Sequence, residues 1–293
     1  SNHMYKLGPV HQGVLERGCK TGSFSYLLFE AHVGAFSVVI GKHTTCLDTA
    51  DLPFSYLLDD HGTSVAIPGQ NLTAVGTIRD SRKWPARDHR RVSRPRDLVV
   101  YDVFSPYTVE KMRRGRRRLD DLLAGLEDGA ESAAFGGAVV TRSRMRRGAD
   151  LYAAAIERYL RGKALDRLEA VLTEGATLDA TRPSLASLAG LRAPAQWMDV
   201  AGLLAARERI EALEAAVASG ETASMADLER RLRAVFDAYR DDEWQYVCAA
   251  HEAEFGAPPV ALSSAQWLEA VDRWEARSVE TIEALLADAA KEF

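Results

Sequence analysis

The chain has 293 residues, of which 47% are hydrophobic and 27% are charged. These values are ordinary for a folded protein of one or two domains, and they exclude a chain that is mainly disordered. No apolar run reaches the roughly 18 residues of a membrane-spanning helix. The first four residues, SNHM, are typical of a purification-tag remnant and not of a signal peptide. Three widely spaced cysteines indicate neither a disulfide framework nor a metal site, so we expect a cytoplasmic protein.

The net charge of -5 conceals a difference between the two halves of the chain. Residues 1–150 contain 22 Lys or Arg and 17 Asp or Glu, whereas residues 151–293 contain 15 and 25. Residues 79–118 alone hold fourteen basic and five acidic side chains. Such a cluster repels itself unless something negative neutralises it. The neutralising group could be the acidic half of the chain or a phosphorylated small molecule. A nucleic acid is a third alternative, which the negative net charge of the whole chain disfavours.

Short apolar stretches bounded by Gly, Pro and Asp predict strands in the first hundred residues, including 25–41 and 64–69. Leu27, Val33 and Val39 are spaced by six residues. This spacing is typical of a left-handed β-helix, in which each six-residue step supplies a short strand and one inward aliphatic side chain. Plain strand alternation produces the same spacing, so an ordinary sheet stays an alternative.

From Ser105 onward the pattern changes to helix. Ser105 is a candidate N-cap with Pro106 at the first helical position, and the run extends to Gly129. Apolar stripes predict further helices at 149–174, 197–219, 224–255 and 264–291. No strand signal follows Val140. We therefore predict an α+β protein, with a tag remnant (1–4), a β-rich part resembling a short left-handed β-helix (5–100), and a mostly antiparallel helical bundle (101–293).

The segment GKHTTCLD, residues 41–48, carries the candidate catalytic groups. His43 lies beside Lys42 and two hydroxyls, and Asp48 could fix its tautomer. Such an imidazole could remove a proton from a sugar hydroxyl or an amine. His32, expected at the edge of a coil, is a second candidate base. A surface histidine without a catalytic role is the simpler alternative at both positions.

The arginines around Trp84 are candidates for binding phosphate, because guanidinium groups bind phosphate in two-pronged geometry. Trp84 could add a stacking surface. The predicted ligand-binding residues are Lys42, Arg79, Lys83, Trp84, Arg87, Arg90 and Arg91. No P-loop, dinucleotide-binding, HExxH or GxSxG motif is present, and we assign no cofactor and no metal ligand.

Four stretches carry a family resemblance: Ala35–Leu58, Arg82–Arg91, Tyr101–Met112 and Ala287–Phe293. They resemble an uncharacterised bacterial family whose members are usually longer, with hexapeptide-repeat β-helix coils in front and a helical domain of unknown function behind. Some members are labelled as related to UDP-N-acetylglucosamine pyrophosphorylase. The resemblance implies that this chain corresponds to the later half of a typical member. It implies no catalytic residues.

Two functions stay open on this basis, one enzymatic and one not. The first is a sugar-nucleotide or acyl transferase that binds a phosphorylated sugar or nucleotide through the basic segment. The second is an assembly or partner-docking module that caps a longer β-helix. Proteins with left-handed β-helices commonly form trimers, so the resemblance also implies a homo-oligomer, and we expect no membrane association.

Overall fold

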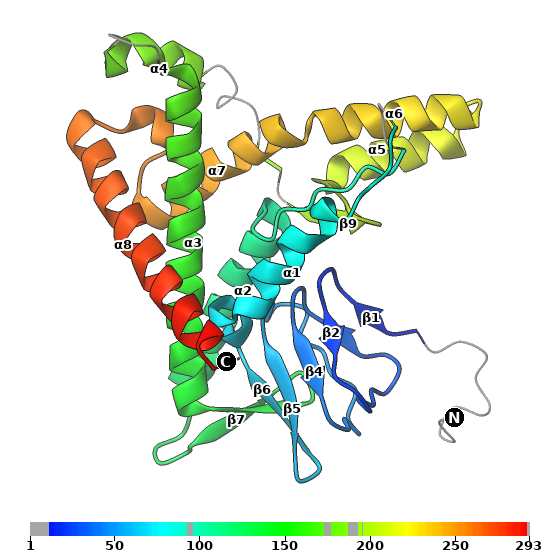
Figure 1. Cartoon of the computed structure of the whole chain (residues 1–293), viewed down its shortest axis with the longest axis vertical. Helices are drawn as coiled ribbons and strands as arrows, with labels where there is room; N and C mark the ends of the chain where they lie inside the picture. The colour runs from blue at the N-terminus through cyan, green and yellow to red at the C-terminus, as the bar shows by residue number, and fades with distance from the viewer. Residues whose placement is uncertain (1–11, 93–95, 173–176, 187–192, 195, 292–293) are drawn as a thin grey trace. The chain divides into compact units, whose positions relative to one another are not determined.

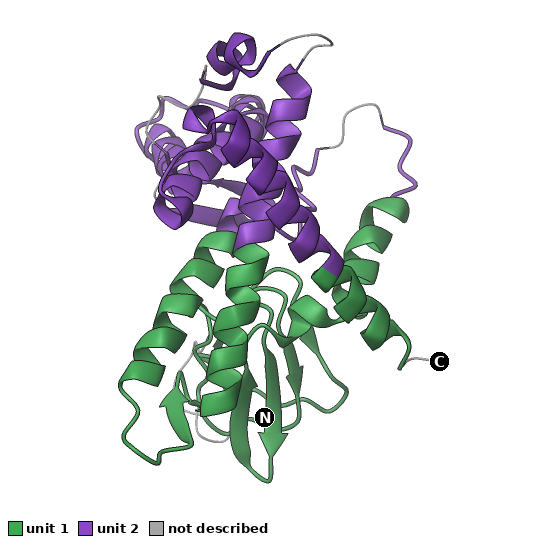
Figure 2. Ribbon diagram, turned by 90° about the vertical axis from the view of Figure 1, so that its left-hand side faces the viewer, with its two compact units in different colours: residues 1–87, 108–156, 280–293 green, residues 88–107, 157–279 purple. Residues whose placement is uncertain are grey.

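The computed structural model describes residues 12–92, 96–172, 177–186, 193–194 and 196–291. The predicted tag remnant at residues 1–4 lies outside the described residues. The chain divides into two compact units, which Figure 2 shows in separate colours. Unit 1 comprises residues 1–87, 108–156 and 280–293, and unit 2 comprises residues 88–107 and 157–279. The two units do not coincide with the predicted β-rich part (5–100) and helical part (101–293). That division stays a prediction.

Unit 1 begins with short parallel strands that repeat along the chain. They are β1 (Val14–Leu15), β2 (Lys20–Thr21), β3 (His32–Val33), β4 (Val38–Ile40) and β5 (Tyr56–Asp60). β1 pairs with β3, β2 with β4, and β4 with β5, in each case between residues that are 18 positions apart. An isolated parallel bridge joins Tyr26 to Lys42. The chain therefore returns to the same place about every eighteen residues, and we call each such circuit a coil.

The side chains inside the coils follow part of the predicted spacing. Val33 and Val39 are fully buried, as are Leu47 and Leu57 on the following circuit. Leu27 is only half-buried, and its neighbour Leu28 is buried instead. The six-residue spacing thus identifies inward positions within one coil.

Beyond β5 the coil register ends. β6 (Thr63–Ile67) runs antiparallel to β5, and β7 (Ser132–Phe135) and β8 (Ala138–Thr141) form an antiparallel hairpin. β8 joins β6 through the parallel pair Val65–Val139, which completes a six-stranded sheet in the order β2-β4-β5-β6-β8-β7 (Figure 1). The stack of coils is therefore closed on this side.

Helices complete unit 1. After the 3-10 turn η2 (Gln70–Thr73), α1 (Val75–Ala86) occupies the end of the part predicted to be β-rich. α2 (Pro106–Ala124) confirms the helix expected from Ser105, and α3 (Arg142–Val171) begins seven residues earlier than predicted. The buried Tyr152 of α3 donates its hydroxyl to the carbonyl of Pro53 at 2.6 Å. This bond fixes the first half of α3 to the turn before β5.

Unit 2 is mainly helical but includes a hairpin. Its elements are the second half of α3, α4 (Leu178–Ala186), β9 (Trp197–Val200), β10 (Leu203–Ala206), α5 (Arg207–Ala218), α6 (Met225–Asp237), α7 (Tyr239–Phe255), η3 (Pro259–Ala261) and most of α8 (Ser264–Ala289). The predicted helix 224–255 is interrupted at Ala238, which separates α6 from α7. Ser263 and Gln266 form the reciprocal cap that starts α8. The mixed α and β class is thus confirmed.

The prediction of a helix over 197–219 is wrong in its first ten residues. Ala201 and Gly202 have φ angles of 53° and 98°, and Asp199 Oδ1 accepts the Gly202 N–H at 2.7 Å. Two successive positive φ angles are typical of a tight hairpin turn and are incompatible with a helix. Leu203 and Ile210 belong to one apolar cluster although one lies on a strand and the other on a helix. Their seven-residue spacing therefore arises from tertiary packing.

Candidate functional site

His43 lies in the coil region after β4 and is fully buried. Its Nδ1 is 2.9 Å from Ser64 Oγ, and its Nε2 has no hydrogen-bond partner among the described residues. Burial lowers the pKa of the imidazole, opposed by a bond with the Ile40 backbone and by the charge of Asp59. The surface-turn alternative is therefore wrong. The catalytic role stays a prediction, and burial counts against it because a substrate must reach the ring.

His32 and Asp48 lie on successive coils and form a parallel backbone bridge. Asp48 Oδ1 accepts the Ala50 N–H at 3.3 Å, so its carboxylate is engaged locally and makes no bond to His43. The carboxylate beside His32 is Glu16, whose Oε1 is 2.7 Å from His32 Nε2. Sequence reasoning missed Glu16, although the coil period points to it, because Glu16 is almost one circuit before His32.

Glu16 is the centre of a buried polar cluster. Its Oε1 accepts a hydrogen bond from Lys111 Nζ at 2.7 Å, and its Oε2 accepts the Ala35 N–H at 3.0 Å. Lys111 also donates to the Ala50 carbonyl at 3.2 Å. The side chains of Glu16 and Lys111 are only 5% and 9% exposed. This cluster ties the first coil to α2.

Four of the predicted phosphate-binding residues lie on α1 or at its end. Arg79 and Lys83 pair with Asp80 at 3.2 and 3.7 Å, and the same carboxylate pairs with Lys20 at 2.5 Å. The hydrogen bond from Lys20 is the main cause that lowers the pKa of Asp80. Trp84 is 67% exposed and Arg87, the C-cap residue of α1, is exposed. Lys42 is exposed in the coil region, where its N–H donates to Asp59.

Arg90 and Arg91 belong to unit 2. Arg90 pairs with Asp88 and with Asp97, at 2.5 and 2.6 Å, and its hydrogen bonds lower the pKa of Asp88 to about 2. Arg91 is exposed. The predicted binding set is thus divided between the two units, and several of its cations already have nearby carboxylates from their own part of the chain.

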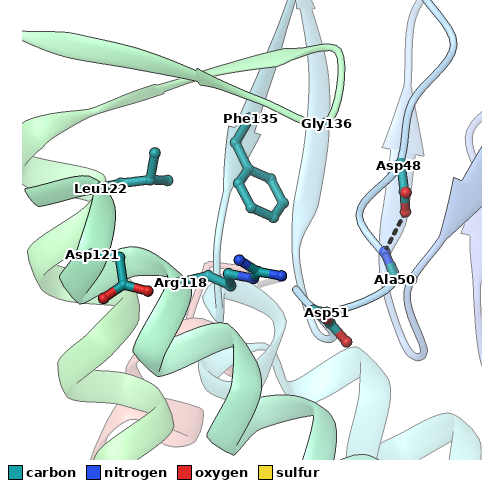
Figure 3. A pocket seen from close by; sticks show the side chains of 8 residues that line it. All are labelled: Asp48, Ala50, Asp51, Arg118, Asp121, Leu122, Phe135 and Gly136. Atoms are coloured by element: carbon teal, nitrogen blue, oxygen red, sulfur yellow. Dashed lines mark hydrogen bonds between the residues drawn. The ribbon is translucent and has the colours of Figure 1, made fainter. Parts of the chain in front are cut away.

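A cavity of about 500 Å³ lies within unit 1, at one side of the coils. Three segments line it: the turn after the second coil, one face of α2, and the tip of the β7–β8 hairpin (Figure 3). The lining residues are Asp48, Ala50, Asp51, Arg118, Asp121, Leu122, Phe135 and Gly136. Of the predicted site residues only Asp48 lines this cavity. The others were missed because three segments far apart in sequence form it.

The backbone at the tip of the β7–β8 hairpin lies against the turn at Asp48, and a glycine allows this close approach. Gly136 has a φ of 52°, and a Cβ atom there would collide with the carbonyl of Asp48. The Asp48 N–H donates to the Gly136 carbonyl at 2.9 Å, and Thr45 Oγ1 donates to the Gly137 carbonyl at 2.7 Å. A residue without a side chain is therefore needed for this close approach.

A smaller cavity of about 280 Å³ lies in unit 2 and includes Glu243 in its lining. The Glu243 carboxylate accepts from the Tyr159 hydroxyl at 2.9 Å and from Arg240 at 2.8 Å, and Lys163 lies 3.5 Å away. Burial raises the pKa of Tyr159 well above its ordinary value. These groups satisfy one another, which is typical of a structural network.

Comparisons with known proteins match both ends of the chain. A family model described as Domain of unknown function (DUF4954) matches residues 1–123, and one described as Domain of unknown function (DUF6819) matches residues 189–293. Both matched stretches are thus similar to domains of unknown function. This is consistent with an uncharacterised family. No curated protein and no solved structure matches the chain. Among the described residues, no helix has the length and apolar character needed to cross a membrane.

Proposed function

We propose that the protein is an assembly module whose DUF4954 region caps a longer left-handed β-helix, with the helical DUF6819 region available for docking partners. The observation that carries this proposal is the asymmetry of the coil stack. On its far side the parallel coils give way to the antiparallel strand β6 and the β7–β8 hairpin, whereas the edge strands β1 and β2 keep the parallel coil register.

Among the described residues, the open side of the stack presents peptide groups without a backbone partner. Val14 N–H and Glu16 N–H donate to the second coil, at the carbonyls of Ala31 and Val33. Because peptide groups that face a given neighbour alternate along a parallel strand, Leu15 directs its N–H and C=O to the open side. Thr21 has the same position between Lys20 and Gly22, which donate to Ser37 and Val39. A further coil in the same register would pair with both residues.

The side chains of the first coil support the same conclusion. Val14, Leu15 and Phe24 are 47%, 53% and 95% exposed. A strand edge with unpaired peptide groups and apolar side chains promotes association between chains. A preceding coil would cover this edge, and its parallel register with an eighteen-residue period supports a β-helix as the partner structure.

The test is to lengthen the stack by one coil. A copy of residues 14–31 inserted before Val14 adds a full circuit of eighteen residues. We expect the amides of Leu15 and Thr21 to exchange rapidly with solvent in the original chain and to become protected in the lengthened one. A copy of residues 14–28 is the matched control, because fifteen residues break the six-residue step. Equal exchange at Leu15 and Thr21 in both variants would refute the proposal.

The second candidate is the sugar-nucleotide or acyl transferase with His43 or His32 as the base. One observation favours it: α1 exposes the Trp84 indole close in sequence to the exposed Lys83 and Arg87. A uridine nucleotide sugar or coenzyme A should then raise the melting temperature, and Arg87→Ala should abolish the shift. The absence of a shift with either ligand would eliminate this candidate. If the β-helix proposal holds, light scattering should also find a homo-oligomer, with a trimer expected.

A further inference from the structure

The cavity of unit 1 contains an exposed arginine, Arg118, that has no partner among the described residues. Arg118 forms no ion pair or hydrogen bond with any residue that the structure describes. Arg114, one turn earlier on α2, pairs with Asp51 at 2.8 Å. Figure 3 shows the Arg118 guanidinium extending across the cavity between Phe135 and Asp51. Its five N–H donors are therefore available to a ligand that carries acceptor oxygens.

The carboxylates of the cavity limit the charge of that ligand. Asp48, Asp51 and Asp121 line the cavity together with a single arginine, and of these three carboxylates only Asp51 has a cationic partner among the described residues. The lining is net negative, so a phosphate dianion would be repelled. A ligand that combines one carboxylate with one ammonium group fits better, since Arg118 can hold the carboxylate in two-pronged geometry and an aspartate can hold the ammonium.

The remaining walls are apolar, and the size of the cavity suits a small molecule. Phe135 and Leu122 provide an aromatic ring and an aliphatic side chain beside Arg118. The volume of about 500 Å³ lies within the range of roughly 300–1,000 Å³ that is usual for small-molecule sites. Polar groups that orient a ligand beside an apolar surface are typical of such sites.

We propose that this cavity binds a small zwitterion, an amino acid or dipeptide with an apolar side chain. Arg118 binds its carboxylate, either Asp121 or Asp48, which lie on opposite sides of the cavity in Figure 3, binds its ammonium group, and Phe135 and Leu122 contact its side chain. The site lies on the closed side of the coil stack, and its occupancy does not require the open edge to be paired. It can therefore be tested independently of the assembly function.

The experiment is isothermal titration calorimetry on the whole chain with L-leucine, L-phenylalanine and L-leucyl-L-leucine. We expect at least one zwitterion to bind and Arg118→Gln to weaken it by about tenfold to a hundredfold, because a charge-assisted pair is lost. Arg117→Gln is the matched control on the same helix, since Arg117 is exposed and pairs with Glu110 outside the cavity lining. This control should leave the affinity unchanged.

Two analogues identify the groups that are bound. Leucinamide lacks the carboxylate and N-acetyl-leucine lacks the ammonium group, so both should bind at least tenfold more weakly than leucine. Unchanged unfolding curves should show that Arg118→Gln is folded, because Arg118 makes no ion pair to the described residues. Absence of binding up to about 10 mM would overturn the proposal. The proposal would also be overturned if Arg118→Gln left the affinity for the zwitterion unchanged, or if inorganic phosphate bound in a way that depends on Arg118.

Discussion

The buried pair of Glu16 and Lys111 should determine the stability of the first coil. Glu16 lies just after β1, whereas Lys111 lies on α2, 95 residues later. Lys111→Met leaves the Glu16 carboxylate with the Ala35 N–H and the His32 ring. Glu16→Gln removes the negative charge beside the Lys111 ammonium group, although the glutamine oxygen can still accept a hydrogen bond from it. Each change leaves one buried charge without its oppositely charged partner.

The geometry sets the expected magnitudes. Removing one partner of a buried ion pair destabilises a protein by about 3–5 kcal/mol, since the other charge loses both water and its partner. We expect Glu16→Gln to lie in this range. For Lys111→Met the remaining hydrogen bonds reduce the loss to about 2–3 kcal/mol. The double variant should lose less than the sum of the two, with a coupling of about 1–3 kcal/mol.

Urea unfolding of the whole chain, followed by circular dichroism, measures these free energies. Hydrogen exchange at the Val14 and Glu16 amides reports whether the first coil detaches from the second. Lys20→Met is the control, because the Lys20–Asp80 pair is 42% and 38% exposed and such pairs contribute about 0–1 kcal/mol. Losses below about 1 kcal/mol in both single variants, or strictly additive losses in the double variant, would refute this reasoning.

Three further predictions concern other buried contacts. Burial lowers the folded-state pKa of His43, so the unfolded chain binds the proton first and the free energy of unfolding falls as the pH drops below about 6.5. His43→Gln should reduce that loss when urea titrations at pH 7.5 and pH 5 are compared. The control His61→Gln, at a fully exposed ring, should leave the loss unchanged. Gly136→Ala should destabilise unit 1 by about 1–3 kcal/mol in thermal melts because its Cβ collides with backbone, and a variant as stable as the original would contradict the packing of the hairpin tip. Asp242→Asn should lower the free energy of unfolding in urea by about 1.5–3 kcal/mol, because the buried carboxylate accepts two hydrogen bonds from Arg209. Arg209→Lys should lower it by less. Equal stability of the original chain and both variants would show that the pair contributes nothing.

Local signals predicted the elements that depend on local physics. The Ser105 and Pro106 start predicted α2, and the apolar stripe over 264–291 predicted α8. The six-residue spacing located the buried Val33 and Val39. Caps and inward positions are set by residues a few positions apart, so they are visible in a single sequence.

Ambiguous spacings led to the errors. Leu203 and Ile210 share a core cluster from a strand and a helix, and their spacing resembled one helical stripe. His43 follows an apolar strand in a polar segment, a pattern that does not distinguish a buried ring from an exposed one. Its burial depends on Ser64 and on neighbouring coils, which lie many residues away.

The sequence by itself determined that the chain mixes strands with helices, that helices begin near Pro106 and Ser264, and that its positive charge is concentrated between residues 79 and 118. Only the tertiary structure decided which carboxylate meets which cation. Lys111 pairs with Glu16 and Arg114 with Asp51, while Arg118 extends into a cavity without a partner among the described residues. The physical reason is that ion pairs act over a few ångströms. Distances that short between distant segments are set by the coil register and by the packing of α2 on the coils, which residue spacing alone does not encode.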